Sequence, residues 1–247
     1  MNRAIKGIGD RYQEETKYSR DGMKIYSTGV FKRAEQYKQY PDAAKVLPLP
    51  HGKPAAGADF WDTLMRRRSH RDFSSAALSL DELALLIFAT QGITDREGQD
   101  LFRAAPSAGA LYPIETYVLA NRVETIDPAI YHLNIAGQSL ELIRPGDCSR
   151  ALAIAALGQA MISTSAATFI WTAIAGRSKW KYHERAYRYI YLDAGHIGQN
   201  LYLAATALGL GCCTIGAFFD SQINDIIGID GENETVVYLG AVGKKQQ

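Results

Sequence analysis

The residues best suited to bind an anion stand in RRRSHRDF, residues 66–73, where four arginines and one histidine fall within six positions. The whole chain has a formal net charge of +1, so this run is a local concentration of positive charge. Arg68, Ser69 and Arg71 place two guanidinium groups and a hydroxyl within four residues, a set of donors that suits a phosphate. The run could also be a solvated helix end, because arginines in a last helical turn interact favourably with the helix dipole.

A second segment, APSAGALYP at residues 105–113, predicts close contact with a flat ligand. Small residues at 107–110 would let the backbone approach a ligand with no side chain in the way. A proline near each end stiffens the entry and the exit. An ordinary surface loop can have the same composition, so the segment alone leaves both interpretations open.

The glycines of GLGCCTIG, residues 209–216, do not predict a dinucleotide-binding turn. Their spacing is GxGxxxxG, whereas the dinucleotide fingerprint is GxGxxG. They also follow an expected helix and lead into an apolar, extended segment, while the fingerprint requires strand, turn and helix in that order. Gly209 or Gly211 is expected to end the preceding helix instead.

In this order and spacing, RRSHRDF, PSAGALYP and ALGLGCCTIGAF resemble the nitroreductase family of flavoproteins. The closer resemblance is to its SagB-type branch, the thiazole/oxazole dehydrogenases that oxidise azoline rings in modified peptides. RYQEETKYSR resembles the N-terminal arm of that branch, and KYHERAYRYIYLDAGHIGQNLYLAA resembles its long central helix. The resemblance covers essentially the whole chain. It implies an α+β fold with a mostly antiparallel sheet flanked by helices, in an intertwined homodimer with two FMN sites at the interface.

The resemblance also assigns residues to the FMN. Those expected at the phosphate and ribityl chain are Arg68, Ser69 and Arg71, with Lys244 closing on the phosphate and Lys245 as its substitute. Those expected along the isoalloxazine, from the other side of the interface, are Ser107, Ala108, Gly109 and Leu111. Those expected to turn a backbone N–H toward flavin N5 are Ile215, Gly216 and Ala217.

Three positions depart from the typical nitroreductase pattern. Typical members carry Asn and Gln where Ala110 and Tyr112 stand, and Glu where Gly216 stands. We therefore expect the polar contacts to the flavin ring to differ in this chain.

The SagB-type branch carries a Lys-Tyr pair ahead of its long helix, and Lys181 and Tyr182 match it. This resemblance implies that the lysine removes a ring proton while a hydride passes to the flavin. A lysine can act as a base only if its pKa is lowered, by burial or by a neighbouring charge such as Arg185. The pair could also be a surface pair at the start of a helix.

Other ring side chains are expected to serve the fold. His196 lies in an apolar helix and is expected to be packed and hydrogen-bonded, while His183 could reach the site. Trp61 and Trp171 are expected in the core rather than stacked on a flavin.

The composition excludes several classes of protein. The chain is 47% hydrophobic and 21% charged, as in ordinary soluble domains, and its balanced charge argues against nucleic-acid and membrane partners. The N-terminus lacks the apolar run of a secretory signal. The three cysteines have no metal-binding spacing and are expected to be small buried residues in a reducing compartment, which predicts no metal and a cytoplasmic location.

The helices and strands are read from apolar periodicity and capping signals. Residues 151–176 are uncharged and long enough to span a bilayer, but their polar middle and a change to β-branched residues favour a buried helix followed by a buried strand. The chain is expected to consist of an arm at 1–57 and a flavin-binding domain at 58–247. The domain is expected to begin with a helix at 58–68, which has Trp61, Leu64 and Met65 on one face, and a helix from the Ser79–Glu82 capping box to Gly92. The elements expected after these are a strand at 116–120, a hairpin of AIYHL and SLELI, the helix and strand of 151–175, a long helix at 184–208, a short helix at 221–228 and a last strand TVVYLGAV. The long helix has an apolar seam of Ile190, Ala194, Ile197, Leu201, Ala204 and Leu208.

These expectations favour an FMN-dependent oxidoreductase acting as a homodimer. The favoured reaction is dehydrogenation of a thiazoline or oxazoline in a modified peptide or a small molecule. The alternatives are a reductase of nitro compounds or quinones, with NAD(P)H as transient reductant, and a flavin-binding partner subunit of a peptide-modifying complex.

Overall fold

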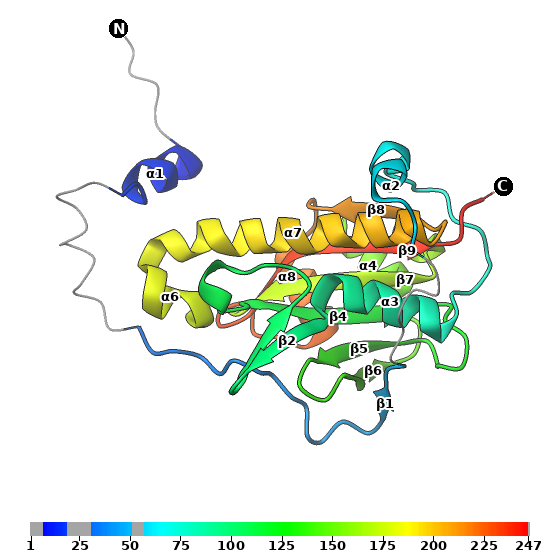
Figure 1. Cartoon of the computed structure of the whole chain (residues 1–247), viewed down its shortest axis with the longest axis horizontal. Helices are drawn as coiled ribbons and strands as arrows, with labels where there is room; N and C mark the ends of the chain where they lie inside the picture. The colour runs from blue at the N-terminus through cyan, green and yellow to red at the C-terminus, as the bar shows by residue number, and fades with distance from the viewer. Residues whose placement is uncertain (1–6, 19–30, 51–56, 247) are drawn as a thin grey trace, which may run out of the picture.

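A seven-stranded sheet lies at the centre of the computed structural model, which describes residues 7–18, 31–50 and 57–246 (Figure 1). Its strand order is β1-β6-β5-β4-β7-β9-β8, and every neighbouring pair is antiparallel. β2 and β3 form a separate antiparallel pair. The strands are β1 (Val46–Pro48), β2 (Ile93–Glu97), β3 (Asp100–Arg103), β4 (Ile114–Ala120), β5 (Ala129–Asn134), β6 (Ser139–Pro145), β7 (Ala167–Ala173), β8 (Gly211–Ile215) and β9 (Thr235–Gly243). The predicted α+β class is confirmed.

Helices pack on both faces of this sheet. One hydrophobic cluster joins the sheet to α3 and α7, and a second joins it to α4, α5 and α8. The α-helices are α1 (Ile8–Glu15), α2 (Phe60–Arg66), α3 (Leu80–Gln91), α4 (Ser149–Ala155), α5 (Met161–Thr164), α6 (Gly176–Tyr182), α7 (Ala186–Ala207) and α8 (Asp220–Ile227), and the 3₁₀ turns at the site are η3 (Ala108–Ala110) and η4 (His183–Arg185).

The two-sided packing explains why the central strands are buried along their whole length. Successive side chains of a strand point to opposite faces. In β4, Val118 belongs to the cluster under α3 and α7, whereas Tyr117 and Leu119 belong to the cluster under α4, α5 and α8. All seven residues of β4 and all seven of β7 are buried. A strand buried on both faces reads as a continuous apolar run rather than as an alternating one.

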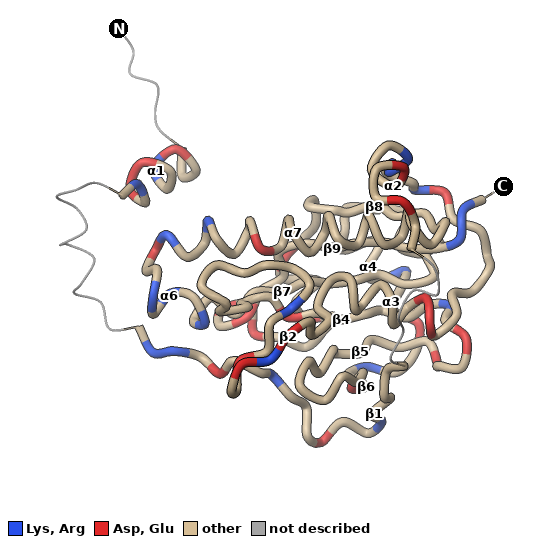
Figure 2. The backbone as a smooth tube through the Cα atoms, viewed as in Figure 1, with Lys and Arg blue, Asp and Glu red and all other residues tan. Residues whose placement is uncertain are grey.

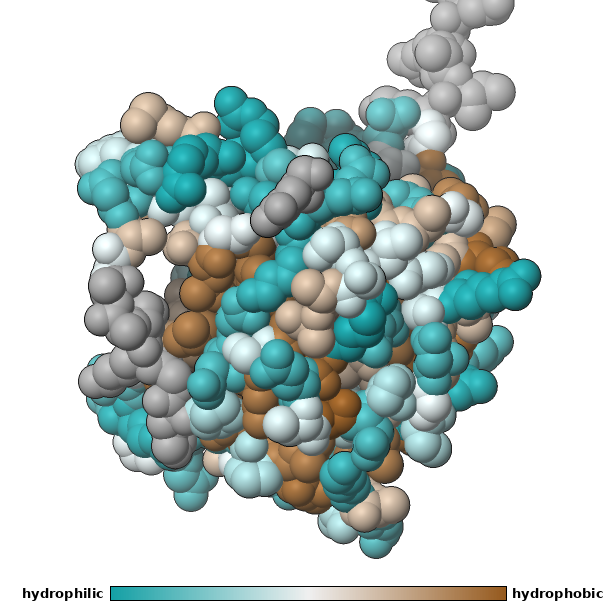
Figure 3. Space-filling view, turned by 90° about the vertical axis from the view of Figure 1, so that its right-hand side faces the viewer, coloured by the Kyte–Doolittle hydropathy of each residue, from teal (hydrophilic) through white to brown (hydrophobic). Residues whose placement is uncertain are grey.

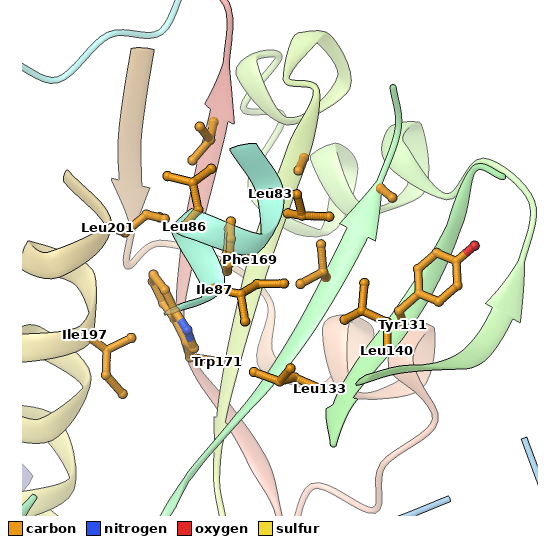
Figure 4. Close-up of a cluster of buried hydrophobic side chains, with 14 of the residues drawn as sticks. Leu83, Leu86, Ile87, Tyr131, Leu133, Leu140, Phe169, Trp171, Ile197 and Leu201 are labelled. Atoms are coloured by element: carbon orange, nitrogen blue, oxygen red, sulfur yellow. The ribbon is translucent and has the colours of Figure 1, made fainter. Parts of the chain in front are cut away.

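The core beneath α3 and α7 contains Trp171 of β7, which is completely buried (Figure 4). Leu86 of α3 and Leu201 of α7 are also completely buried and lie in the same cluster. Burying a large apolar side chain contributes about 1.5–3 kcal/mol to folding. The prediction that Trp171 is a core residue is therefore confirmed.

Local signals placed the helix ends correctly. Ser79 Oγ accepts a hydrogen bond from the Glu82 backbone N–H at 3.1 Å, and Glu82 Oε2 accepts one from the Ser79 N–H at 2.9 Å. This is the predicted capping box, which satisfies two donors at the start of α3. α3 ends before Gly92, and Gly209, with φ +74°, follows the end of α7.

The structure corrects three other expectations. Trp61 and Met65 of α2 are each 69% exposed, so this helix does not turn its apolar face into the core of the chain. The helical part of residues 151–176 is two short helices, α4 and α5, rather than one helix. None of the helices among the described residues is long and apolar enough to cross a membrane. The seam of α7 is buried through Leu201, whereas Ala204 and Leu208 are only partly buried.

A buried polar network lies at the start of β4. Glu115 Oε1 accepts a hydrogen bond from Arg177 Nη1 at 2.5 Å, and Glu115 Oε2 lies 2.8 Å from His132 Nε2. All three side chains are at most 3% exposed. Burial raises the pKa of the Glu115 carboxyl, but the charge of Arg177 and the hydrogen bond from His132 outweigh that effect and hold the pKa at about 2.

Of the arm expected at residues 1–57, positions 1–6, 19–30 and 51–56 lie outside the described residues. The described part of the arm includes α1 and β1, and β1 pairs with β6 at the edge of the sheet. The surface is mixed, with apolar patches between hydrophilic residues on the face seen in Figure 3.

Candidate functional site

The basic loop that follows α2 is fixed to the ends of β8 and β9. The His70 N–H donates to the Cys212 carbonyl at 2.9 Å, and the Ser74 N–H donates to the Lys244 carbonyl at 2.9 Å. The Phe73 ring is buried against Gly211 and Gly243, where an added Cβ would lie 3.1 Å from it. Glycine in both strands therefore makes room for the ring that anchors the loop.

The loop and the C-terminal basic residues meet near α2 (Figure 2). The predicted phosphate residues Arg68, Ser69, Arg71 and Lys244 thus belong to one region of the chain. Lys244 Nζ pairs with Glu82, which partly neutralises its charge. Within the described residues, no carboxylate lies in salt-bridge distance of the guanidinium groups of Arg68 and Arg71. Their positive charge is therefore available to an anion.

Arg67 lies beside the predicted phosphate residues, and the sequence did not distinguish it from its neighbours. Its guanidinium lies 5.2 Å from the centre of the Tyr202 ring, and the Tyr202 hydroxyl lies 2.9 Å from Ser69 Oγ. The Thr214 N–H of β8 donates to the same hydroxyl at 3.0 Å. Arg68, in contrast, is exposed and donates to the carbonyl oxygens of the preceding turn. Nothing in a run of three arginines indicates which one turns inward.

A carboxylate on α7 holds the loop at residues 107–112. Ser107 Oγ donates to Asp193 Oδ2 at 2.6 Å, and the Ala108 N–H donates to Asp193 Oδ1 at 3.3 Å. The Tyr112 N–H in turn donates to Ser107 Oγ at 2.9 Å. Asp193 is 4% exposed, and its burial raises its pKa despite these hydrogen bonds. An aspartate inside an otherwise apolar helix face was the signal in the sequence that could have pointed to it.

The backbone of this loop lies in sparsely populated conformations. Gly109 has φ +65°, and Ala110 and Tyr112 also have positive φ, at +54° and +45°. Left-handed conformations of non-glycine residues are uncommon and cluster at functional sites, where the surrounding structure must enforce them. The bonds to Asp193 supply part of that enforcement.

Lys181 and Tyr182, at the end of α6, meet the loop at Gly109. A Cβ atom added to Gly109 would lie 2.5 Å from the Tyr182 hydroxyl and 2.8 Å from Lys181 Nζ. Lys181 Nζ also lies 5.4 Å from the centre of the Tyr182 ring. The structure thus brings the predicted catalytic pair to the predicted flavin-contacting loop, and a side chain at position 109 would displace the ends of both residues.

The basic loop and the Gly109 loop are both attached to α7. The first is attached at Tyr202 and the second at Asp193. These attachments are nine positions apart on the helix, about 14 Å at a rise of 1.5 Å per residue. One helix therefore holds both of the predicted cofactor-binding segments.

The third predicted segment leaves the end of β8. Ile215 is buried, whereas Gly216 and Ala217 are exposed. A Cβ atom on Gly216 would meet nothing within 4 Å, so the backbone at this position is open. A ligand here would find the main chain unobstructed.

One of the two histidines of the long segment differs from expectation. His196 is exposed, so the prediction that it is packed is wrong. It lies on the outer face of α7 with Tyr191 and Leu192, which are 58% and 59% exposed. His183 is next to Tyr182 and its ring lies edge-on to Phe31 at 5.7 Å. The apolar seam of α7 faces the core, so a residue on the opposite side of this helix faces outward.

Residues 64–244 match the family model described as the Nitroreductase family. The chain belongs to the nitroreductase family. It is therefore an oxidoreductase, and the matched span contains the basic loop, the Gly109 loop and the Lys181–Tyr182 pair.

Three known proteins are similar to this nitroreductase-family chain. The Methanocaldococcus jannaschii protein MJ1384, named as a nitroreductase, is 38% identical over 184 residues, which are 74% of this chain and 90% of that protein. The trifolitoxin-processing protein TfxB of Rhizobium leguminosarum bv. trifolii is 33% identical over 163 residues, 62% of this chain and 44% of TfxB. A solved structure from Anabaena variabilis, described as a nitroreductase, has a TM-score of 0.79 and 30% identity, covering 99% of this chain and 49% of that one. The match thus spans about half the length of the Anabaena protein and less than half the length of TfxB.

Proposed function

We propose that this chain is an FMN-dependent dehydrogenase of the SagB type, which oxidises azoline rings to azoles. The observation that carries the proposal is the meeting of Lys181 and Tyr182 with Gly109. A lysine and a tyrosine opposite a loop that admits a flat ring form a place where a ring proton can be removed. The similarity to the trifolitoxin-processing protein TfxB supports a modified peptide as the substrate class, although a small azoline would meet the same groups.

The residues present fit an FMN phosphate. Arg67, Ser69 and Arg71 offer two guanidinium groups and a hydroxyl on a loop fixed to the sheet. Lys244 would move from Glu82 to the phosphate when the anion binds. The open backbone at Gly216 suits a flat ring approaching the end of β8. When bound, FMN supplies the two-electron acceptor that the chain itself lacks.

The chain's own residues would hold the substrate and move its proton. Lys181 Nζ would accept the proton from the azoline ring carbon. The Tyr182 hydroxyl, at the same edge of the loop, would donate a hydrogen bond to the ring nitrogen. Asp193 would keep the Gly109 loop in place, because it binds both Ser107 and the Ala108 N–H.

We also propose that two copies of the chain assemble so that the Gly109 loop of one completes the phosphate half of the other. This proposal follows the resemblance, which implies that the Gly109 loop reaches the flavin from the other side of a subunit interface. The outer face of α7 and α2 exposes large apolar side chains, among them Trp61, Met65 and Leu192. A homodimer that covered this face would bury them and bring the two halves together.

Two other functions have support. A nitro or quinone reductase that takes electrons from NAD(P)H is favoured by the similarity to MJ1384, which covers 90% of that protein. A flavin-binding subunit of a peptide-modifying complex is favoured by TfxB, of which this chain matches less than half. We place the protein in the cytoplasm, since its three cysteines are free and buried.

Absorption spectroscopy of the purified protein, followed by identification of the released cofactor, tests the flavin. One FMN per chain is expected. Anaerobic mixing with a synthetic thiazoline peptide should then bleach the flavin bands and yield the thiazole in a single turnover. A Lys181→Ala variant that binds FMN but oxidises the thiazoline as fast as the unaltered protein would exclude the proposed base. Rapid bleaching by NADPH with no reaction of the thiazoline would favour the reductase.

A further inference from the structure

We propose that the N-terminal arm is part of the active site, because Tyr18 and Phe31 clamp the corner between α6 and α7 and so position Lys181 and Tyr182 against Gly109. The inference rests on the proposed function of the Lys181–Tyr182 pair. The residues of the arm lie outside the span that matches the family model, which begins at residue 64. The similarity to the solved Anabaena variabilis structure covers 99% of this chain and therefore extends into the arm.

The corner that carries the pair needs support. α6 ends at Tyr182, and the next residue, His183, has φ +50° and ψ −138°. An L-residue in such a conformation costs on the order of 1–3 kcal/mol and persists only when the surroundings enforce it. The orientation of Lys181 and Tyr182 relative to Gly109 therefore depends on what is packed against this corner.

The second described part of the arm packs on the α6 side of the corner. The Phe31 ring meets the His183 ring edge-on at 5.7 Å, and Lys179 Nζ lies 4.9 Å from the centre of the Phe31 ring. Two residues on, the Arg33 guanidinium lies 5.3 Å from the centre of the Trp180 ring. These contacts surround Lys181 and Tyr182 in the sequence on both sides.

The first described part of the arm packs on the α7 side. Arg185 Nη1 donates to the Thr16 carbonyl at 2.7 Å, and Arg188 donates to Thr16 Oγ1 at 2.8 Å and to the Gln13 carbonyl at 2.6 Å. The last carbonyls of a helix have no partner within it and attract cations, so the two arginines hold the end of α1. The Arg185 guanidinium also lies 4.3 Å from the centre of the Tyr18 ring.

Tyr189 connects this contact to the catalytic pair. Arg185 Nε donates to the Tyr189 hydroxyl at 3.0 Å, and the Tyr189 ring lies edge-on to the Tyr182 ring at 4.8 Å. Tyr18 therefore reaches Tyr182 through one guanidinium and one ring. Lys and Arg residues gather along α6 and the start of α7 in Figure 2, and two of them, Arg185 and Arg188, donate to oxygen atoms of Gln13 and Thr16 at the end of α1.

Hydrogen–deuterium exchange on the full chain with bound FMN tests the clamp directly. In the double variant Tyr18→Ala, Phe31→Ala, we expect the backbone amides of residues 176–190 to exchange at least about 10-fold faster. The amides of residues 67–73 and 211–217 should exchange at an unchanged rate. The matched control is Lys45→Ala, an arm residue in an exposed ion pair with Asp127. Unchanged exchange at the corner in the double variant would overturn the clamp, whatever reaction the enzyme performs.

Steady-state oxidation of a synthetic thiazoline peptide in air, with oxygen returning the reduced flavin to its oxidised form, tests the positioning role. The double variant should lose about 10-fold or more in kcat with little change in KM and with full FMN content. Tyr18→Phe, which keeps the ring over Arg185, should restore kcat in the presence of Phe31. A double variant with faster exchange at the corner but unchanged kcat would overturn the positioning role. If the unaltered protein does not oxidise the thiazoline, the proposed function fails and the exchange result still decides the clamp.

Discussion

Replacement of Gly109 by alanine is the sharpest test of the site. Gly109 has φ +65°, so an alanine there loses about 1–2 kcal/mol from the left-handed conformation alone. The new Cβ would also lie 2.5 Å from the Tyr182 hydroxyl, which must retreat by about 0.9 Å to reach an ordinary contact of 3.4 Å. A displacement of about 1 Å at a reacting group can cost about 100-fold in rate. We therefore expect a modest loss of stability and a large loss of turnover.

Gly98 offers a matched control for this substitution. It has φ +58° in the β2–β3 hairpin, and a Cβ there would meet nothing within 4 Å. Both variants should lower the melting temperature by a few degrees, at about 2–4 °C per kcal/mol for a chain of this size. Only Gly109→Ala should reduce the rate of flavin bleaching by a thiazoline peptide, by about 100-fold at full FMN content. Equal turnover in the two variants would refute the inference that Lys181 and Tyr182 act at Gly109.

Further predictions concern cofactor binding, assembly and pH. Arg67→Ala should weaken FMN binding by about 10- to 100-fold, the loss of one charged hydrogen bond, and Arg68→Ala should have a much smaller effect, as measured by flavin fluorescence titration. Leu192→Asp should elute as a monomer in size-exclusion chromatography. The control Ile154→Asp alters a residue of α4 with the same 59% exposure and should elute at the volume of the unaltered protein. Identical elution volumes for the two variants would contradict the proposed interface. Glu115→Gln should lower the free energy of unfolding by about 3–5 kcal/mol at pH 7, because it leaves buried cations unpaired. The pKa of Glu115 is lowered from 4.5 to about 2, so its ionised form stabilises the fold above pH 4.5, and this stability is lost as the pH falls toward 2. Denaturant unfolding should therefore show a smaller difference in the free energy of unfolding between the unaltered protein and Glu115→Gln at pH 3 than at pH 7.

Much of the fold could be predicted from the sequence because its signals are local. The capping box needs only Ser79 and Glu82, three residues apart, and the structure has both of its hydrogen bonds. The run TYVLA predicted a strand and the run ATFIWTAI predicted a buried strand, and the structure has β4 and β7 at these positions. The hairpin β2–β3 and the helix α6 were missed, since charged and aromatic residues there give no clear periodicity.

The exposed face of α2 shows where periodicity misleads. Trp61 and Met65 form an apolar stripe, which in most helices packs on the chain's own core. Here both side chains are exposed. An apolar face on a helix predicts that other residues cover it, but it does not indicate whether those residues belong to the same chain or to a second copy.

By itself the sequence determined the α+β class, most helix ends and the three segments that resemble a flavin site. Tertiary structure alone decided that Arg67 rather than Arg68 turns toward Ser69, that Asp193 holds the Gly109 loop, and that Lys181 meets that loop. Helix ends depend on hydrogen bonds between residues a few positions apart, which a sequence displays directly. Lys181 and Gly109 are more than seventy residues apart, and they meet only because α6, α7 and the loop pack on the same end of the sheet.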